Sequence, residues 1–250
     1  MILSIVIVLG MTPFASVAET GEDLTDIPAG AIPLSSVDDL ALIGYEYSLD
    51  SYFYLTQDID MTAATSRNGD YYNDGLGWQP IGSASTPFTG TFDGRNHTIT
   101  GMHINRADES YIGFIASMSG TIKNLNFRES LIYGKENVGT VVGYGFGYIE
   151  NCNILSGEVF SNNGETGNYV GGIAGYISSI RDCSSNAGVY ASNGAYFGGI
   201  AGIAGSISNC KCSSTLSLIC GATKYDDLLR EWVYSFGGIA GKASVVTDSY

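Results

Sequence analysis

The stretch at residues 170–175 reads Val-Gly-Gly-Ile-Ala-Gly, and its recurrence along the chain decides the fold. Close copies begin at Ile112, Val138, Phe197 and Phe236, so successive copies lie 26, 32, 27 and 39 residues apart. Sequence periods of roughly 20 to 50 residues are typical of solenoids, propellers and other repeat arrays. The 250-residue chain is therefore expected to be built from similar stacked units.

The composition of this phrase excludes two simple structures. Its apolar residues stand three positions apart with glycines between them, and each glycine costs a helix about 1 kcal/mol relative to alanine. An unbroken strand would place the two apolar residues on opposite faces. The phrase therefore predicts a strand that turns a corner at glycine, where positive φ carries no side-chain strain.

A second phrase follows the first in every copy and predicts a second corner. It begins with an apolar residue and has a short polar residue two positions later; the five polar positions are Asn124, Asn151, Asp182, Asn209 and Thr247, the last within residues 245–248. Asn and Asp tolerate the left-handed backbone region and bond their own backbone. Each repeat is then one coil of short strands joined by bends.

Stacked coils of this kind predict an all-β chain folded as a right-handed parallel β-helix, because parallel crossovers are nearly always right-handed. Equivalent side chains should stack in columns about 4.8 Å apart. One column is expected at the polar corner and one inside: Asn124, Asn151, Asp182 and Asn209 in the first, and Leu125, Cys152, Cys183 and Cys210 in the second. The stacked cysteines could be a metal or redox site or could form disulfides. Buried thiols are the favoured interpretation, because zinc requires four ligands around one point.

The beginning of the chain predicts export. An apolar run at residues 2–9, then Gly10 and Pro13, then small residues at 16–18 indicate a secretory signal peptide over residues 1–18. We expect a linker at 19–33, a cap with the first coils at 34–111, and repeat coils at 112–250. Ser36 and Asp39 form a capping-box pattern that predicts a short capping helix. The absence of a predicted cap near Tyr250 suggests a truncated repeat region.

Net charge and hydropathy argue against nucleic-acid binding and against a membrane-spanning segment. The formal net charge is −14, from 25 acidic and 11 basic residues. A field of that sign repels phosphate backbones, so no nucleic-acid partner is expected. No later stretch is long and apolar enough to predict a membrane span, and extracellular or cell-surface localisation follows from the signal peptide.

Three segments near the front resemble a known family. Residues 55–60 read Leu-Thr-Gln-Asp-Ile-Asp, residues 78–82 read Trp-Gln-Pro-Ile-Gly, and residues 88–94 read Phe-Thr-Gly-Thr-Phe-Asp-Gly. Followed by the glycine-rich coils, this order resembles bacterial and archaeal surface proteins with the GLUG motif, an arrangement also found beside the catalytic part of bacterial immunoglobulin A metallopeptidases. The resemblance covers residues 34–250. It implies an adhesin or scaffold β-helix and carries over no catalytic residue.

Two groups of polar residues are candidate chemical sites. Asp58 and Asp60 could serve a carbohydrate-active enzyme, as clustered acids do in glycoside hydrolysis, or could cap turns. A loop rich in oxygen ligands is a weak calcium candidate through Asn68, Asp70, Asn73 and Asp74, although it lacks the downstream bidentate Glu. His97 and His103 lack the spacing of a zinc peptidase. No catalytic residue and no cofactor other than calcium is therefore expected.

The longest repeat contains an insertion with the densest charge in the chain. Its residues 223–232 predict either a short helix on the flank of the solenoid or a ligand-binding element. Tyr225, Trp232 and Tyr234 are the candidate ligand-binding residues, since Trp and Tyr anchor sugars and protein partners. The sequence thus favours a surface adhesin or scaffold with a glycan or a surface protein as partner. The alternatives are a carbohydrate-active β-helix enzyme and a non-catalytic spacer of a larger surface peptidase.

Overall fold

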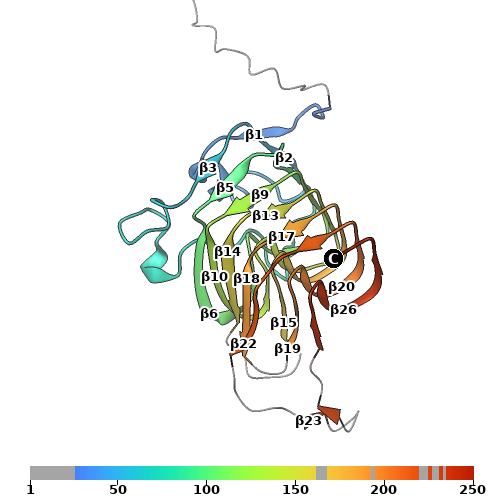
Figure 1. Ribbon diagram of the computed structural model, residues 1–250. Helices are drawn as coiled ribbons and strands as arrows, with labels where there is room; N and C mark the ends of the chain where they lie inside the picture. Colours follow the sequence, from blue (N-terminus) through green and yellow to red (C-terminus); the bar gives the residue numbers. More distant parts are fainter. Residues whose placement is uncertain (1–25, 162–167, 193–194, 220–224, 227–230, 233–234) are drawn as a thin grey trace, which may run out of the picture.

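The chain folds as a parallel β-helix in the computed structural model (Figure 1). The structure describes residues 26–161, 168–192, 195–219, 225–226, 231–232 and 235–250. Strands from successive coils pair side by side into three long sheets, and strand pairs within these sheets are parallel. The predicted all-β, parallel β-helical fold is confirmed.

The three sheets differ in length. The ten-stranded sheet contains β1 (Ile32–Leu34), β2 (Tyr52–Leu55), β4 (Thr91–Asp93), β7 (Ile115–Met118), β8 (Thr121–Lys123), β11 (Val142–Gly145), β12 (Tyr148–Glu150), β16 (Ala174–Arg181), β20 (Ala201–Ser208) and β26 (Ala240–Thr247). The eight-stranded sheet contains β6 (His103–Ile112), β10 (Ser130–Val138), β14 (Gly157–Ser161), β15 (Asn168–Gly171), β18 (Gly188–Ser192), β19 (Ala195–Gly198), β22 (Leu216–Ile219) and β25 (Ser235–Gly237). The six-stranded sheet contains β3 (Ile59–Asp60), β5 (Thr98–Thr100), β9 (Asn126–Arg128), β13 (Asn153–Ile154), β17 (Ser184–Ser185) and β21 (Lys211–Cys212).

The inside of the coils is a column of apolar side chains. Ile122, Ile149, Ile180 and Ile207 occupy the same register on four neighbouring strands, and each is at most 1% exposed. Near the start of the solenoid the column is aromatic. The ring of Phe114 meets those of Phe92 and Phe127 edge to face, with centroids 5.3 and 5.6 Å away. These stacked layers form one continuous core that holds the sheets together.

The glycines of the repeated phrase act differently from the prediction. None of those described has the positive φ that was expected at the first corner. They are needed because backbones approach closely there. A Cβ at Gly139 would lie 2.6 Å from the Cα of Ala174, and one at Gly175 would lie 2.5 Å from the carbonyl oxygen of Gly143. The expected reason for these glycines was wrong, and close stacking between coils is the physical one.

The second corner has the predicted left-handed backbone. Asn124, Asn151, Asp182 and Asn209 have φ of 53°, 49°, 55° and 49°. In the last coil the residue in this conformation is Asp248, with φ of 49°, and not Thr247. The predicted alignment of the last phrase was therefore wrong by one residue. The apolar sequence Val245-Val246 fits either register, and the strand pairing selects Val246 opposite Ile207.

Among the described residues, one short α-helix covers the first coils. Helix α1 (Val37–Ala41) begins after Ser36, whose Oγ accepts a hydrogen bond from the backbone N of Asp39 at 3.1 Å. The carboxylate of Asp39 reaches back to the backbone N of Ser35 at 2.7 Å. Burial raises the pKa of Asp39, but the hydrogen bonds from Ser35 and Ser36 outweigh it, so the net pKa is lowered. A 3-10 turn, η1 (Asn73–Gly75), lies in the following loop.

Replacing the N-cap gives a testable result. We expect Ser36→Ala to lower the free energy of unfolding by about 1 kcal/mol, because the N–H of Asp39 loses its acceptor. Chemical unfolding followed by circular dichroism measures this, with the exposed Ser85→Ala as control. An unchanged unfolding midpoint for Ser36→Ala would show that α1 needs no cap.

The predicted helix in the insertion at residues 223–232 is contradicted where the structure describes it. There, β23 (Tyr225–Asp226) and β24 (Glu231–Trp232) pair antiparallel, with Tyr225 opposite Trp232. Aromatic residues favour strand pairing, and this preference overrides the helical spacing of the apolar residues.

Several predictions concern other parts of the chain. The signal peptide at 1–18 lies outside the described residues, and the linker at 19–33 is described only from residue 26. Cys220 and Tyr234 also lie outside them. Within the described part of the chain, no helix has the length and apolar character needed to cross a membrane.

Candidate binding site

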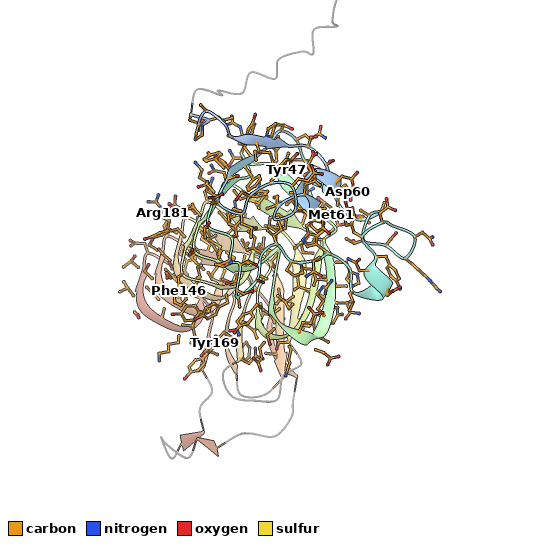
Figure 2. All side chains as sticks on the ribbon, turned by 180° about the vertical axis from the view of Figure 1, so that it is seen from behind. Tyr47, Asp60, Met61, Phe146, Tyr169 and Arg181 are labelled. Carbon is orange, nitrogen blue, oxygen red and sulfur yellow. The ribbon has the colours of Figure 1, made fainter. Side chains whose placement is uncertain are left out.

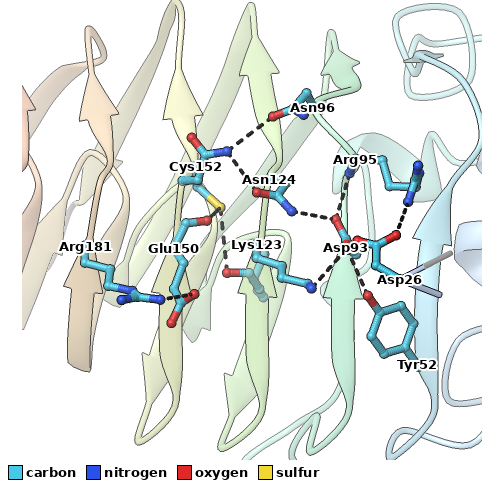
Figure 3. Close-up of polar contacts among 12 residues, drawn as sticks. Asp26, Tyr52, Asp93, Arg95, Asn96, Lys123, Asn124, Glu150, Cys152 and Arg181 are labelled. Atoms are coloured by element: carbon cyan, nitrogen blue, oxygen red, sulfur yellow. Dashed lines mark hydrogen bonds and ion pairs between the residues drawn. The ribbon is translucent and has the colours of Figure 1, made fainter. Parts of the chain in front are cut away.

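The polar corner is a hydrogen-bonded column that begins at Asp93 (Figure 3). Asn124 Nδ2 donates to Asp93 Oδ1 at 3.0 Å, and Asn151 Nδ2 donates to Asn124 Oδ1 at 2.8 Å. Further along, Asn209 Nδ2 donates to Asp182 Oδ1 at 2.6 Å. The residues assigned to this column from sequence therefore lie together. Their amides bond one another, which is a structural use of the side chains.

Asp93 was not singled out from the sequence, yet it has the most partners at this corner. Its carboxylate is 1% exposed and accepts hydrogen bonds from the Tyr52 hydroxyl at 2.9 Å and the Arg95 backbone N at 3.0 Å. Lys123 Nζ lies 3.2 Å away. Burial raises the pKa of Asp93, but its hydrogen bonds, with that from Asn124 foremost, outweigh burial and lower the pKa. The group stays ionised as a structural anchor.

The inner column contains Leu125 and three free cysteines. Cys152, Cys183 and Cys210 are at most 2% exposed and form no disulfide. Burial, foremost, raises the pKa of the Cys183 thiol well above its ordinary value. A hydrogen bond with Cys183, followed by burial, raises the pKa of Cys210. Protonated, buried thiols are poor metal ligands and poor nucleophiles. No cluster of three or more His, Cys, Asp or Glu suited to a metal occurs in the described residues.

The two acidic residues near the front both bond backbone amides, Asp58 across to the neighbouring coil and Asp60 within its own turn. Asp58 Oδ1 accepts a hydrogen bond from the backbone N of Thr98 at 2.9 Å and lies 3.2 Å from His97 Nδ1. Asp60 Oδ1 accepts from the backbone N of Thr62 at 2.8 Å. Hydrogen bonds from Thr62 lower the pKa of Asp60, whereas a general acid needs a raised pKa. This geometry favours the turn-capping alternative.

The weak calcium candidates lie in the loop before β4. Asn68, Asp70, Asn73 and Asp74 are all exposed, and Asn73 Nδ2 donates to the carbonyl oxygen of Gly77 at 2.8 Å. Asn73 and Asp74 have φ of 47° and 54°, which fits a tight turn. The loop is fastened by Tyr71, whose hydroxyl donates to Asp38 Oδ1 at 2.7 Å. Calcium binding here stays a prediction.

The structure places only the backbone of two of the three predicted ligand-binding residues. Tyr225 and Trp232 face each other across the β23–β24 pair, and Tyr234 lies outside the described residues. Their role in binding stays a prediction.

The outer face of the eight-stranded sheet carries an aromatic column that sequence reasoning missed. Tyr133, Phe160 and Tyr190 lie in register on β10, β14 and β18, and their side chains are half-buried. Their rings stack face to face at 4.5 and 4.6 Å, with interplanar angles of 6° and 11°. The coil spacing sets this distance.

A larger group of rings surrounds Tyr144. We call it the aromatic cluster; its members are Tyr111, Tyr144, Phe146, Tyr169, Tyr176 and Tyr196. Tyr144 stacks on Tyr176 at 4.7 Å and meets Phe146 edge to face at 5.3 Å. Phe146 is 59% exposed. Figure 2 shows Phe146 and Tyr169 in one region of the molecule, away from Asp60.

Two phenols of the aromatic cluster have a raised pKa. Burial, followed by the neighbouring tyrosines, raises the pKa of Tyr144 and of Tyr169. Lys242 Nζ lies over the ring of Tyr196, 5.9 Å from its centroid. The cluster therefore presents ring faces with hydroxyl groups that both donate and accept, a combination suited to stacking against a sugar or a protein side chain.

One sequence signal could have located the cluster. Tyr144 and Tyr176 directly follow the six-residue phrases at 138–143 and 170–175, so extending the alignment of the repeats by one residue would have placed them in one column. Tyr169 and Tyr196 stand one residue before the phrase in two successive repeats. The prediction considered only the insertion as a binding element and overlooked these recurrent tyrosines.

The fold defines the chain as a parallel β-helix with outward aromatic rings, and comparisons extend this description. No protein-family model matches the chain, so the resemblance to GLUG-motif proteins stays a prediction. The chain is 33% identical over 136 residues to halomucin of Haloquadratum walsbyi, which is 51% of this chain and 1% of halomucin. It is 34% identical over 111 residues to a "Putative Gly-rich membrane protein" of Evansella cellulosilytica, which is 42% of this chain and 12% of that protein.

A solved structure shares the fold. The chain is similar to the crystal structure of a "putative immunoglobulin A1 protease" from Bacteroides ovatus, with a TM-score of 0.61 and 23% sequence identity. The match covers 87% of this chain and 64% of that chain. The expected likeness to a β-helical region of immunoglobulin A proteases is thus confirmed for the fold alone.

Proposed function

We propose that this chain is a surface module, a rigid β-helix that binds a glycan or a surface protein without catalysing a reaction. The observation that carries the proposal is the aromatic cluster, in which six rings are held on consecutive coils with Phe146 largely exposed. Rigid strands fix the spacing of these rings before a ligand arrives, which reduces the entropy lost on binding.

Placement at the cell surface is supported by the comparisons and by the predicted signal peptide. One similar protein is named a Gly-rich membrane protein and the other halomucin, and the matched regions are small parts of both. Only 14% of the residues are charged, and the net charge is acidic. This composition is consistent with a polar surface formed mainly by Ser, Thr, Asn and Tyr. Tyr225, Trp232 and Tyr234 are proposed as a second contact of the same module.

The enzyme alternative has less support. Asp58 and Asp60 each accept a hydrogen bond from a backbone N–H, which supports a structural role for both carboxylates. The spacer alternative is favoured by the fold neighbour among immunoglobulin A proteases and does not conflict with binding. A spacer with exposed rings can hold a substrate surface while another part of a longer protein acts.

Glycan arrays and soluble polysaccharides test the proposal. We expect binding without release of new sugar ends, and we expect Phe146→Ala to weaken it about tenfold, because one stacking ring is worth about 1 kcal/mol. Tyr148→Ala is the matched control, since Tyr148 is 56% exposed but lies outside the ring contacts described. Isothermal titration measures affinity, and reducing-end assays measure product.

Two results would contradict the proposed function. Sugar release that disappears in Asp58→Asn or Asp60→Asn would make the protein an enzyme. Equal loss of binding in Phe146→Ala and Tyr148→Ala would remove the aromatic cluster as the binding surface.

A further inference from the structure

The corner between β4 and β5 is longer than the corners that follow it along the solenoid. Four residues, 94–97, join these two strands, whereas two residues join β8 to β9, β12 to β13, β16 to β17 and β20 to β21. Strand pairing keeps β4 in register with β8 and β5 in register with β9, so the two extra residues lie in the corner itself. Insertions in solenoids often form a functional surface, and this one contains Asn96.

Asn96 is also the one asparagine of the chain that stands in an N-glycosylation sequon. The sequence reads Asn96-His97-Thr98, and none of the other fourteen asparagines has Ser or Thr two positions later. Asn-x-Ser/Thr, with any residue except proline in the middle, is the acceptor signal for N-linked glycans and lies on surface loops of exported proteins. The signal peptide predicted at residues 1–18 would direct the chain to export, during which this transfer takes place.

The backbone holds Asn96 in a tight turn. His97 N donates to the carbonyl oxygen of Gly94 at 2.8 Å, and Arg95 and Asn96 between them have φ of 47° and 66°. Asn96 N donates to the carbonyl oxygen of Asn124 at 2.7 Å, which ties the turn to the next coil. Asn96 is nevertheless exposed, so the fold presents it to solvent from a fixed backbone.

The side-chain amide of Asn96 directs its oxygen toward the polar column (Figure 3). Asn96 Oδ1 accepts a hydrogen bond from Asn151 Nδ2 at 3.2 Å. Other asparagines at this corner use Nδ2 within the column, as Asn124 does toward Asp93. Asn96 Nδ2 makes no hydrogen bond with another residue that the structure describes. The nitrogen that N-glycosylation modifies is therefore the atom of this side chain that the column does not use.

We infer that Asn96 carries an N-linked glycan. The co-reactant is an oligosaccharide joined to a lipid through pyrophosphate. Asn96 Nδ2 forms a bond to the anomeric carbon of the first sugar, the bond from that carbon to the phosphate oxygen breaks, and the lipid pyrophosphate leaves with the electron pair. One Nδ2 proton passes to a base of the transferase, and nothing is oxidised or reduced. The modification goes beyond the proposed binding function and involves no residue of the aromatic cluster.

The glycosylated side chain keeps the contacts of the folded corner. The side-chain carbonyl is unchanged by the reaction, so Asn96 Oδ1 still accepts from Asn151. Thr98, which supplies the hydroxyl of the sequon, is held through its backbone N, which donates to Asp58 Oδ1 at 2.9 Å. The Thr98 hydroxyl bonds no other described residue, and valine favours strands, so Thr98→Val should fold while it removes the sequon.

Mass spectrometry of the exported chain tests the inference. The full chain, residues 1–250, is produced in a eukaryotic secretory host and collected from the medium. Treatment with peptide-N-glycosidase in heavy-oxygen water converts a glycosylated Asn to labelled Asp, which is located in proteolytic peptides. We expect the label at Asn96 in most chains. Thr98→Ser should keep it, since the hydroxyl remains, and Thr98→Val should lose it.

The same chain made in a host without the transferase is the matched control for stability. We expect the glycosylated and unglycosylated forms to have the same unfolding midpoint, because the hydrogen bond from Asn151 to Asn96 persists in both. A lower midpoint for the glycosylated form would contradict the orientation assigned to this amide.

Unmodified Asn96 in exported chains, or a label that persists in Thr98→Val, would overturn the inference. Unmodified chains retained inside the cell would do the same, because the transfer accompanies export. Polysaccharide binding separates this result from the proposed function. We expect Thr98→Val to bind polysaccharide as the parent does and Phe146→Ala to keep the glycan. A glycan at Asn96 on a chain that binds no polysaccharide would contradict the proposed function alone.

Discussion

Gly199→Ala is expected to lower the free energy of unfolding by about 3 kcal/mol, because the added methyl group would be overpacked between coils. A Cβ at Gly199 would lie 2.6 Å from the carbonyl oxygen of Gly238 and would overlap the Sγ of Cys212. The carbonyl belongs to the next coil, which is held by the hydrogen bond from Gly199 N to Gly238 O. Relief of the contact therefore requires separation of two coils.

The repeat supplies a matched control at the same position of the phrase. A Cβ at Gly238 meets nothing within 4 Å, so Gly238→Ala should change stability by less than about 0.5 kcal/mol. Urea unfolding of both variants, followed by circular dichroism, measures the difference. Equal stability of the two variants would show that close stacking of coils is not the reason for these glycines.

Asp93→Ala is expected to cost about 3 kcal/mol, because the substitution removes the centre of a buried polar network. Tyr52 and Asn124 each lose a hydrogen-bond acceptor, and Lys123 Nζ loses its neighbouring carboxylate. Asp93→Asn should cost less, since an amide oxygen can still accept while the charge is lost. The exposed Asp50→Asn serves as the control and should be neutral.

The same carboxylate makes stability depend on pH. The folded pKa of Asp93 is lowered, so its contribution is present above the unfolded pKa of about 3.9 and is lost as pH falls through the folded value. The stability difference between the parent protein and Asp93→Asn should therefore be constant from neutral pH to about pH 5 and should shrink below about pH 4. Unfolding midpoints across this range measure it. A difference that grows on acidification would contradict the assignment.

The repeat period of the glycine-rich phrase was enough to predict stacked coils. Neighbouring parallel strands lie at a fixed spacing, and stacking the coils is one of few arrangements that bury residues such as Ile149 and Ile180. The Asn and Asp residues at the second corner were predictable for a similar local reason, since left-handed backbone selects these residue types. At the last coil the local pattern was ambiguous, and only pairing with β20 placed Asp248 at the corner.

The binding surfaces were less predictable, because they depend on residues from different coils. Tyr144 and Phe146 are unremarkable in the sequence and form a surface only when Tyr176 from the next coil stacks beside them. In the insertion, helical spacing was misleading, and Tyr225 pairs with Trp232 across an antiparallel ladder.

Sequence by itself determined the class of fold, the left-handed second corner and the inward column of Cys152, Cys183 and Cys210, because these follow from local backbone preference and a repeated period. Tertiary structure decided why Gly199 must be glycine, how Asp93 is held, and which aromatic rings of different coils stack on one another. Those features depend on distances between atoms of different coils. The number of residues in each connection varies from repeat to repeat, so these distances cannot be read from the sequence.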